Sequence, residues 1–223
     1  VQLDLCVLDD EGRSVLMCLA AKGYFSLIRE ALDYLPASSA NMDRLLVDVF
    51  QGYQSNGRQY YVLDQAFHNF KLADKQYVNK YKQYQEKNEQ LKSANIGASK
   101  ATLEKELRLL KLEMEHLDFE MCSYLNIVQL FLEAKGNLLG DNKSVKSYVN
   151  SLKRNVQHYY DGWDIACYGH SIVDFMSIPD TANPLLYSRC EMLYQCFSLL
   201  KCQDTRAKES FKYTLERLKN KNN

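Results

Sequence analysis

Proline and glycine are scarce in this sequence, with three prolines and nine glycines among 223 residues. Proline interrupts helices, and both residues supply the turns that short-stranded folds need. Their scarcity argues against an all-β fold and favours long, uninterrupted helices. Because 46% of the residues are hydrophobic, the chain has enough apolar surface to build a core, and we expect it to be folded rather than disordered.

The sequence also lacks an apolar run long enough to cross a bilayer and a segment typical of a signal peptide. Its seven cysteines contain no CxxC pair, and Cys190, Cys196 and Cys202 recur every six residues, which places them on different faces of a helix. These cysteines are typical of free thiols in a reducing compartment. We therefore expect a cytoplasmic protein, and any contact with a membrane should be peripheral.

Motifs that support catalysis are missing as well. The sequence has no phosphate-binding loop, dinucleotide fingerprint, zinc-protease motif or nucleophile elbow. Four scattered histidines do not form a metal-ligand spacing: His68, His116, His158 and His170. Four carboxylates surround one predicted helix, and we expect them to face solvent: Glu113, Glu115, Asp118 and Glu120. The sequence thus predicts a protein that is not an enzyme and that holds no metal or cofactor.

Heptad spacing is the strongest positive signal. From Tyr60 to Leu91, apolar and aromatic residues recur at alternating steps of three and four, with Asp74 and Asn88 as the polar members. After a break at 94–99, a second seam runs without a polar residue, and we expect it to form the core of a bundle or dimer: Leu103, Leu107, Leu110, Met114, Leu117, Met121, Tyr124 and Val128. A helix over 99–135 would be about 55 Å long and must lie along neighbours.

Weaker signals complete the predicted organisation. We expect helices over 13–35 and from residue 42 onward, a turn at 54–57 within the latter, and a further helix around 149–166. A last helix is predicted over 186–218. The predicted fold class is all-α, an elongated antiparallel coiled coil or helical bundle. Residues 1–41 form an N-terminal helical segment, and residues 42–223 form the long-helix bundle.

Charge is balanced overall but uneven along the chain. Residues 71–111 carry ten basic and five acidic side chains. A basic surface attracts anionic lipid or nucleic acid, although lysines on helix exteriors also serve simply for solubility. Nucleic-acid binding would require aromatic rings outside the core, whereas the tyrosines follow the seams, so no nucleic acid is expected. The candidate membrane-contact residues are Lys80, Lys82, Lys87, Lys92, Lys100 and Lys105.

Three stretches resemble BAR domains, in particular those that precede a PH domain in Arf GTPase-activating proteins and in the oligophrenin group. Asp74-Lys75 followed by Tyr77, Tyr81, Tyr84 and Lys87 is similar to that family's second helix. The segment from Leu103 through Phe119-Glu120-Met121-Cys122-Ser123-Tyr124-Leu125 to Tyr159-Tyr160-Asp161-Gly162 is similar to the helix that follows. Gly57-Arg58-Gln59-Tyr60-Tyr61 with Ala66-Phe67 looks like the end of its first helix.

The resemblance implies a homodimer whose helices form a curved bundle with a basic surface for anionic membrane. It also implies a role in membrane trafficking or endocytosis, through sensing or stabilising curvature, with a small GTPase or other proteins as further partners. The rival hypothesis is a helical scaffold segment of a large assembly, of the nuclear-pore, tethering or coat type, that binds proteins and not lipid. The neutral net charge favours this rival.

Overall fold

The computed structural model describes residues 7–33, 40–93, 98–134, 143–162 and 184–202. This part of the chain is mostly helical, which confirms the all-α class. Its helices are α1 (Val15–Ala21), α2 (Phe25–Asp33), α3 (Ala40–Gln51), α4 (Val62–Ser93), α5 (Ala98–Ala134), α6 (Lys143–Gly162) and α9 (Pro184–Leu199). Among these helices, none is both long and apolar enough to span a bilayer.

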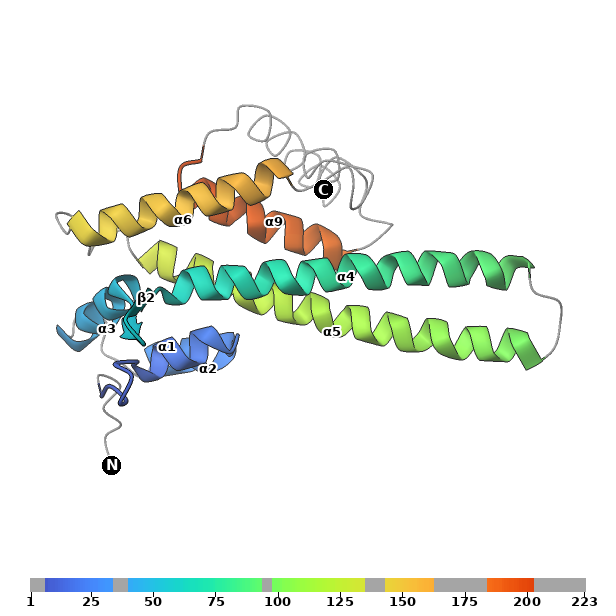
Figure 1. Cartoon of the computed structure of the whole chain (residues 1–223), viewed down its shortest axis with the longest axis horizontal. Coiled ribbons are helices and arrows are strands. Elements are labelled where there is room, and N and C mark those ends of the chain that lie inside the picture. The colour runs from blue at the N-terminus through green and yellow to red at the C-terminus, as the bar shows by residue number, and fades with distance from the viewer. Residues whose placement is uncertain (1–6, 34–39, 94–97, 135–142, 163–183, 203–223) are drawn as a thin grey trace, which may run out of the picture.

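The two longest helices, α4 and α5, form an antiparallel hairpin (Figure 1). The predicted helix over 99–135 is confirmed to within a residue at each end. One half of the hairpin lies among the other helices, and its far half projects beyond them (Figure 1). We call the projecting part, where the two helices lack other neighbours among the described elements, the distal hairpin. An elongated bundle of BAR type remains a prediction.

The N-terminal helices pack into the same core as the hairpin. The Ser14 hydroxyl caps α1 by accepting a hydrogen bond from the Met17 N–H at 3.3 Å. Gly23 turns the chain from α1 into α2 with a φ of +76°, and a Cβ there would lie 3.0 Å from the ring of Tyr124 on α5. Leu16 and Ile28 belong to the common hydrophobic core. The domain boundary near residue 41 stays a prediction.

A small β-hairpin separates α3 from α4. Strand β1 (Tyr53–Ser55) pairs with the antiparallel strand β2 (Arg58–Tyr60), and Asn56 and Gly57 connect them with φ of 51° and 71°. Two positive φ angles in an Asn-Gly pair are typical of a type I′ turn, whose twist matches that of the strands it joins. The expectations of a turn within a helix, and of a helix end at 57–61, are therefore wrong.

The last described helix is shorter than predicted. Helix α9 ends at Leu199, and Lys201 takes a left-handed φ of 53°. The N–H groups of Lys201 and Cys202 bond back to the carbonyls of Ser198 and Phe197, which closes the helix end. The predicted continuation over 203–218 lies outside the described residues.

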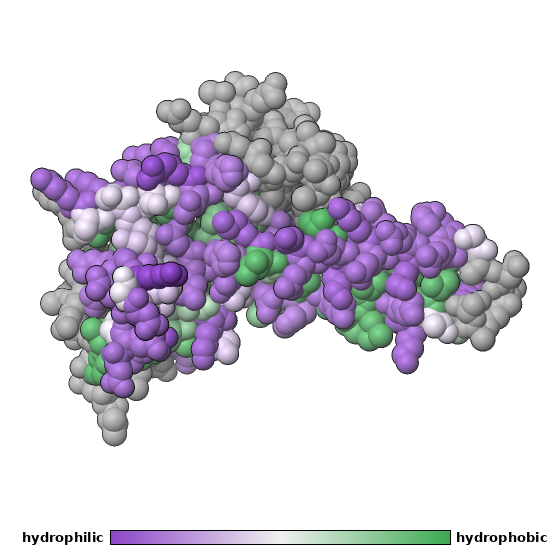
Figure 2. Space-filling model, viewed as in Figure 1, coloured by the Kyte–Doolittle hydropathy of each residue, from purple (hydrophilic) through white to green (hydrophobic). Residues whose placement is uncertain are grey.

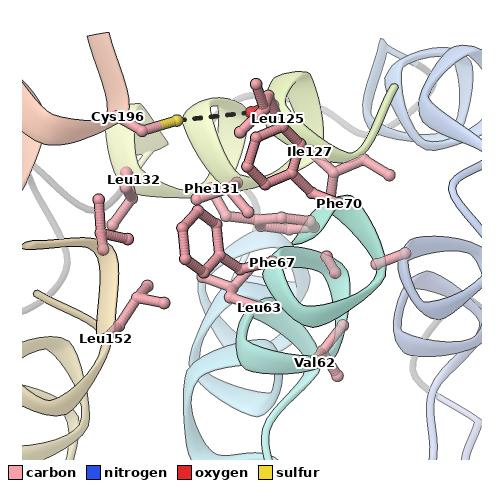
Figure 3. Close-up of a cluster of buried hydrophobic side chains, with 14 of the residues drawn as sticks. Val62, Leu63, Phe67, Phe70, Leu125, Ile127, Phe131, Leu132, Leu152 and Cys196 are labelled. Carbon is pink, nitrogen blue, oxygen red and sulfur yellow. Dashed lines mark hydrogen bonds between the residues drawn. The ribbon is translucent and has the colours of Figure 1, made fainter. Parts of the chain in front are cut away.

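The hydrophobic core sits where α4, α5, α6 and α9 meet the N-terminal helices. Phe67 and Phe70 from α4, Phe131 from α5 and Leu152 from α6 point toward one another there, beside Cys196 of α9 (Figure 3). The Cys196 thiol contacts the Leu125 carbonyl oxygen at 3.7 Å. The sequence's apolar content is thus concentrated at one end of the hairpin, and the distal hairpin depends on the α4–α5 contact alone.

Candidate functional site: the distal hairpin and a buried charge cluster

The predicted seam of α5 is largely buried within one chain. Five of its eight residues are buried: Leu107, Leu110, Leu117, Met121 and Val128. The other three are half-buried: Leu103, Met114 and Tyr124. The seam packs against the chain's own helices, and whether a second copy adds to it stays a prediction.

Three of the six candidate lysines are held in ion pairs. The Lys80 amine lies 2.7 Å from Glu113, and the Lys87 amine lies 2.6 Å from Glu106, so both pairs link α4 to α5. Lys92 lies 2.6 Å from Glu89 on its own helix. Such surface pairs contribute about 0–1 kcal/mol each to stability. Their main consequence here is that these three positive charges are already partly neutralised.

The other three lysines are positioned differently. Lys82 and Lys105 are exposed, and Lys100 is half-buried. Within the described residues, no carboxylate lies within 4.0 Å of their amines. Since Lys100 and Lys105 lie in the first turns of α5, at the free end of the hairpin, these charges are placed where an external anionic surface could approach.

A row of exposed apolar side chains runs along α5, with two members on its distal half and one just past its midpoint. Leu109, Leu112 and Phe119 are 52%, 61% and 70% exposed. Their heptad spacing places them on one face of the helix, and Lys105 and His116 occupy the intervening positions of the same row. We call these five residues the outer stripe. It lies on the opposite side of α5 from the buried seam, and apolar patches stand out among the polar side chains of the distal hairpin in Figure 2.

A second feature is a cluster of buried charges where α9 meets the hairpin. Arg189 of α9 is 2% exposed, and its Nη1 lies 3.2 Å from Asp118 of α5 and 3.7 Å from Asp74 of α4. The same nitrogen lies 3.0 Å from the Met121 sulfur. The guanidinium carbon stands 4.4 Å from the centre of the Tyr77 ring, a cation–π contact.

A fourth helix joins this cluster through a hydroxyl. Tyr159 of α6 donates a hydrogen bond of 2.5 Å to Asp74, and its ring packs edge-on against Phe67 and Phe70. One guanidinium therefore serves two buried carboxylates. Because removing a charge from water costs several kcal/mol unless it is paired, this cluster fixes how α4, α5, α6 and α9 fit together.

The shared guanidinium does not fully compensate the burial of Asp118. Burial raises the pKa of Asp118 to about 6, and the negative charges of Asp74 and Glu115 act in the same direction, while Arg189 lowers it. The carboxyl therefore binds a proton in a range where an exposed aspartate would be ionised. The cluster is therefore a buried ion network in which the ionised form of one member, Asp118, is disfavoured.

The described residues offer little for chemistry. No three histidine, cysteine or acidic side chains among them are grouped as metal ligands. Burial raises the pKa of the Cys122 thiol to about 11 and that of Cys196 to about 12, so both stay protonated near neutral pH and are poor nucleophiles. Two features of the described residues stand out instead: the exposed apolar and basic side chains of the hairpin, and the buried charge cluster where α9 meets it.

Sequence reasoning missed the buried cluster. The expectation that the α5 carboxylates face solvent is wrong for Asp118, while Glu113 and Glu115 are exposed. Asp74 gave a signal as a polar member of an otherwise apolar seam, and Arg189 gave another as a charge in an apolar stretch. Neither signal identifies the partner, because the pairing depends on where α9 packs.

Comparison of the chain with protein-family models, with curated proteins and with solved structures finds no match.

Proposed function

We propose that this chain is a non-enzymatic, dimeric module that binds anionic membrane from the cytoplasmic side and senses or stabilises its curvature, in the manner of a BAR domain. The observation that carries the proposal is the distal hairpin. It is a two-helix projection that carries Lys82 along α4 and Lys100 and Lys105 near its end, all three outside any ion pair among the described residues. A projecting basic end is suited to reach a surface that the rest of the molecule does not touch.

The magnitude of lysine attraction explains why several must act together. Each lysine near an anionic leaflet contributes about 1 kcal/mol, so three contribute about 3 kcal/mol, which is marginal for one chain. A homodimer would present two such ends to the same surface. The second end then binds at a high effective concentration, which is the reason for including dimerisation in the proposal.

Vesicle sedimentation with the whole chain tests the proposal. We expect binding to vesicles that contain phosphatidylserine and weak binding to pure phosphatidylcholine. Reversing Lys82, Lys100 and Lys105 to glutamate should weaken binding by roughly a hundredfold or more at low salt. A matched control reverses three exposed basic residues far from the hairpin end: Arg29 on α2 with Lys143 and Arg154 on α6.

Two results would contradict the proposal. Either the unaltered chain fails to bind anionic vesicles, or the control triple weakens binding as much as the hairpin triple. In the second case the attraction comes from total charge and not from the hairpin end.

The second candidate is a helical scaffold segment that binds proteins and not lipid. The pairing of Lys80, Lys87 and Lys92 with glutamates favours it, because it removes half of the candidate lysines from lipid contact. Small-angle scattering with a measured mass separates the two. A curved dimer well over about 100 Å long fits the first proposal, on the helix lengths involved, and a compact monomer fits the second.

A further inference from the structure

We propose that the outer stripe of α5 inserts its apolar side chains into the interfacial layer of the anionic membrane, so that α5 is the helix of the hairpin that enters this layer. This inference rests on the proposed function and adds to it which face of the hairpin meets lipid, and by what force. The residues that enter the layer are Leu109, Leu112 and Phe119, with Lys105 beside them.

The exposure of these side chains is not the ordinary scatter of apolar residues on a surface. Single exposed leucines are common in folded proteins. Here three large apolar side chains, each more than half exposed, share one face of one helix within eleven residues. Among the described residues, the rest of the molecule leaves that face open. An aligned apolar row on a helix with polar flanks is the pattern of helices that lie in a membrane interface.

The polar members of the stripe favour lipid over a packed protein helix. Lys105 and His116 stand in line with the leucines. A partner helix packed along the stripe would have to bury the Lys105 amine, which costs several kcal/mol unless the partner supplies an anion at that position. At a membrane interface the lysine stem lies along the apolar layer, and its amine reaches the phosphates. The stripe is therefore unfavourable for packing against a protein helix but suited to a membrane interface.

A second copy of this chain fits the stripe less well than lipid does. Three side chains expose much less than the about 800 Å² per partner that stable protein interfaces bury. In addition, Glu106, Glu113 and Glu120 follow one flank of the stripe at heptad intervals. In an antiparallel pair of α5 helices, this flank would face the same flank of the other copy and set together carboxylates that the lysines of α4 neutralise only in part.

The charges beside the stripe predict how binding depends on salt. Arg108 and Lys111 are exposed on its other flank, and Glu104 and Glu115 each stand four residues from one of them. On the opposite flank, Glu106 and Glu113 are paired with lysines of α4, and Glu120 offsets Lys105. Local charge is thus nearly balanced, and electrostatic attraction alone would hold this face weakly. Apolar insertion must provide much of the affinity. Because salt screens exposed charges but not apolar burial, a part of the binding should survive high salt.

The test compares two matched leucine pairs in the full chain. One variant carries Leu109→Ser and Leu112→Ser on the stripe, and the control carries Leu27→Ser on α2 and Leu72→Ser on α4. The control leucines are 49% and 47% exposed, so both variants remove similar exposed apolar area from helices. Binding is measured by sedimentation with phosphatidylcholine–phosphatidylserine vesicles at low and at high salt, and circular dichroism checks that the helices remain.

We expect the stripe variant to bind about tenfold more weakly at both salt concentrations, and the control variant to bind as the unaltered chain does. The inference is overturned if the stripe and control variants bind equally well, or if the stripe variant loses affinity only because it no longer self-associates, as a mass measurement would reveal. The latter result would make a second copy the occupant.

These outcomes are distinct from failure of the proposed function. If the unaltered chain binds no anionic vesicles, the function and the inference fall together. If it binds, loses binding on reversal of Lys82, Lys100 and Lys105, and yet tolerates serine at Leu109 and Leu112, only the inference falls.

Discussion

Replacing Asp118 with asparagine should change how the stability of the protein depends on pH. In the folded protein the pKa of Asp118 is raised to about 6 from an ordinary 3.8, chiefly by burial. The folded state therefore holds a proton on this group over a range where the unfolded chain has released it. The free energy of unfolding should then fall as pH rises from 3.8 toward 6, and this contribution should be constant above that range.

The magnitude follows from the size of the shift. A shift of about two pKa units corresponds to about 3 kcal/mol, at 1.36 kcal/mol per unit. The Asp118 side chain is 3% exposed, so solvent screens little of this energy. Asparagine has nearly the same shape but cannot ionise. As the pH rises from about 4 to about 7, the free energy of unfolding of the variant should therefore increase by up to about 3 kcal/mol relative to that of the unaltered protein.

Urea unfolding followed by circular dichroism at several pH values measures this difference. Other carboxylates titrate in both proteins and cancel in the comparison. Glu104→Gln is the matched control, because Glu104 is an exposed carboxylate on the same helix about four turns from Asp118, and this change should leave the pH dependence of the unaltered protein nearly unchanged. A stability difference between the Asp118→Asn variant and the unaltered protein that stays constant across this range would refute the reasoning. In that case burial would not raise the pKa of Asp118.

Two further perturbations address the buried charge cluster and a third addresses the β-hairpin between α3 and α4, and denaturant unfolding measures each. Arg189→Met leaves two buried carboxylates without their cation and should cost about 3–5 kcal/mol, so a loss under about 1 kcal/mol would mean that the cluster is not buried in solution. Tyr159→Phe keeps the ring packing but removes the hydrogen bond to Asp74, and should cost about 1–3 kcal/mol; no loss would indicate that Asp74 finds another donor. Gly52→Ala places a Cβ 2.1 Å from the Tyr60 carbonyl oxygen and should destabilise far more than Gly57→Ala, whose Cβ would meet open space at a similar positive φ; equal losses would contradict this clash.

The sequence by itself determined the long helices and their buried faces. The apolar steps of three and four predicted α5 to within a residue, because a helix that must bury one face over about ten turns carries that face in its sequence. The type I′ hairpin at Asn56-Gly57 was also visible in principle, since Asn-Gly between short β-prone runs is its signature. The apolar spacing around it nevertheless favours a helix, and this is why the pattern predicts a turn within a helix there.

Only the tertiary structure decided which charged residues are paired or buried and which apolar residues are exposed. Lys80 and Lys82 look alike in the sequence, and their difference arises because Glu113 of α5 reaches one of them and not the other. The sequence predicts that Asp118 is a surface carboxylate, but in the structure α9 covers it and supplies Arg189 as its partner. Leu109 and Leu112 read as further apolar members of a heptad helix, and their exposure follows from which side of α5 the other helices occupy. Helical periodicity is local and is written along the chain, whereas the partner of each face is set by contacts between residues far apart in sequence.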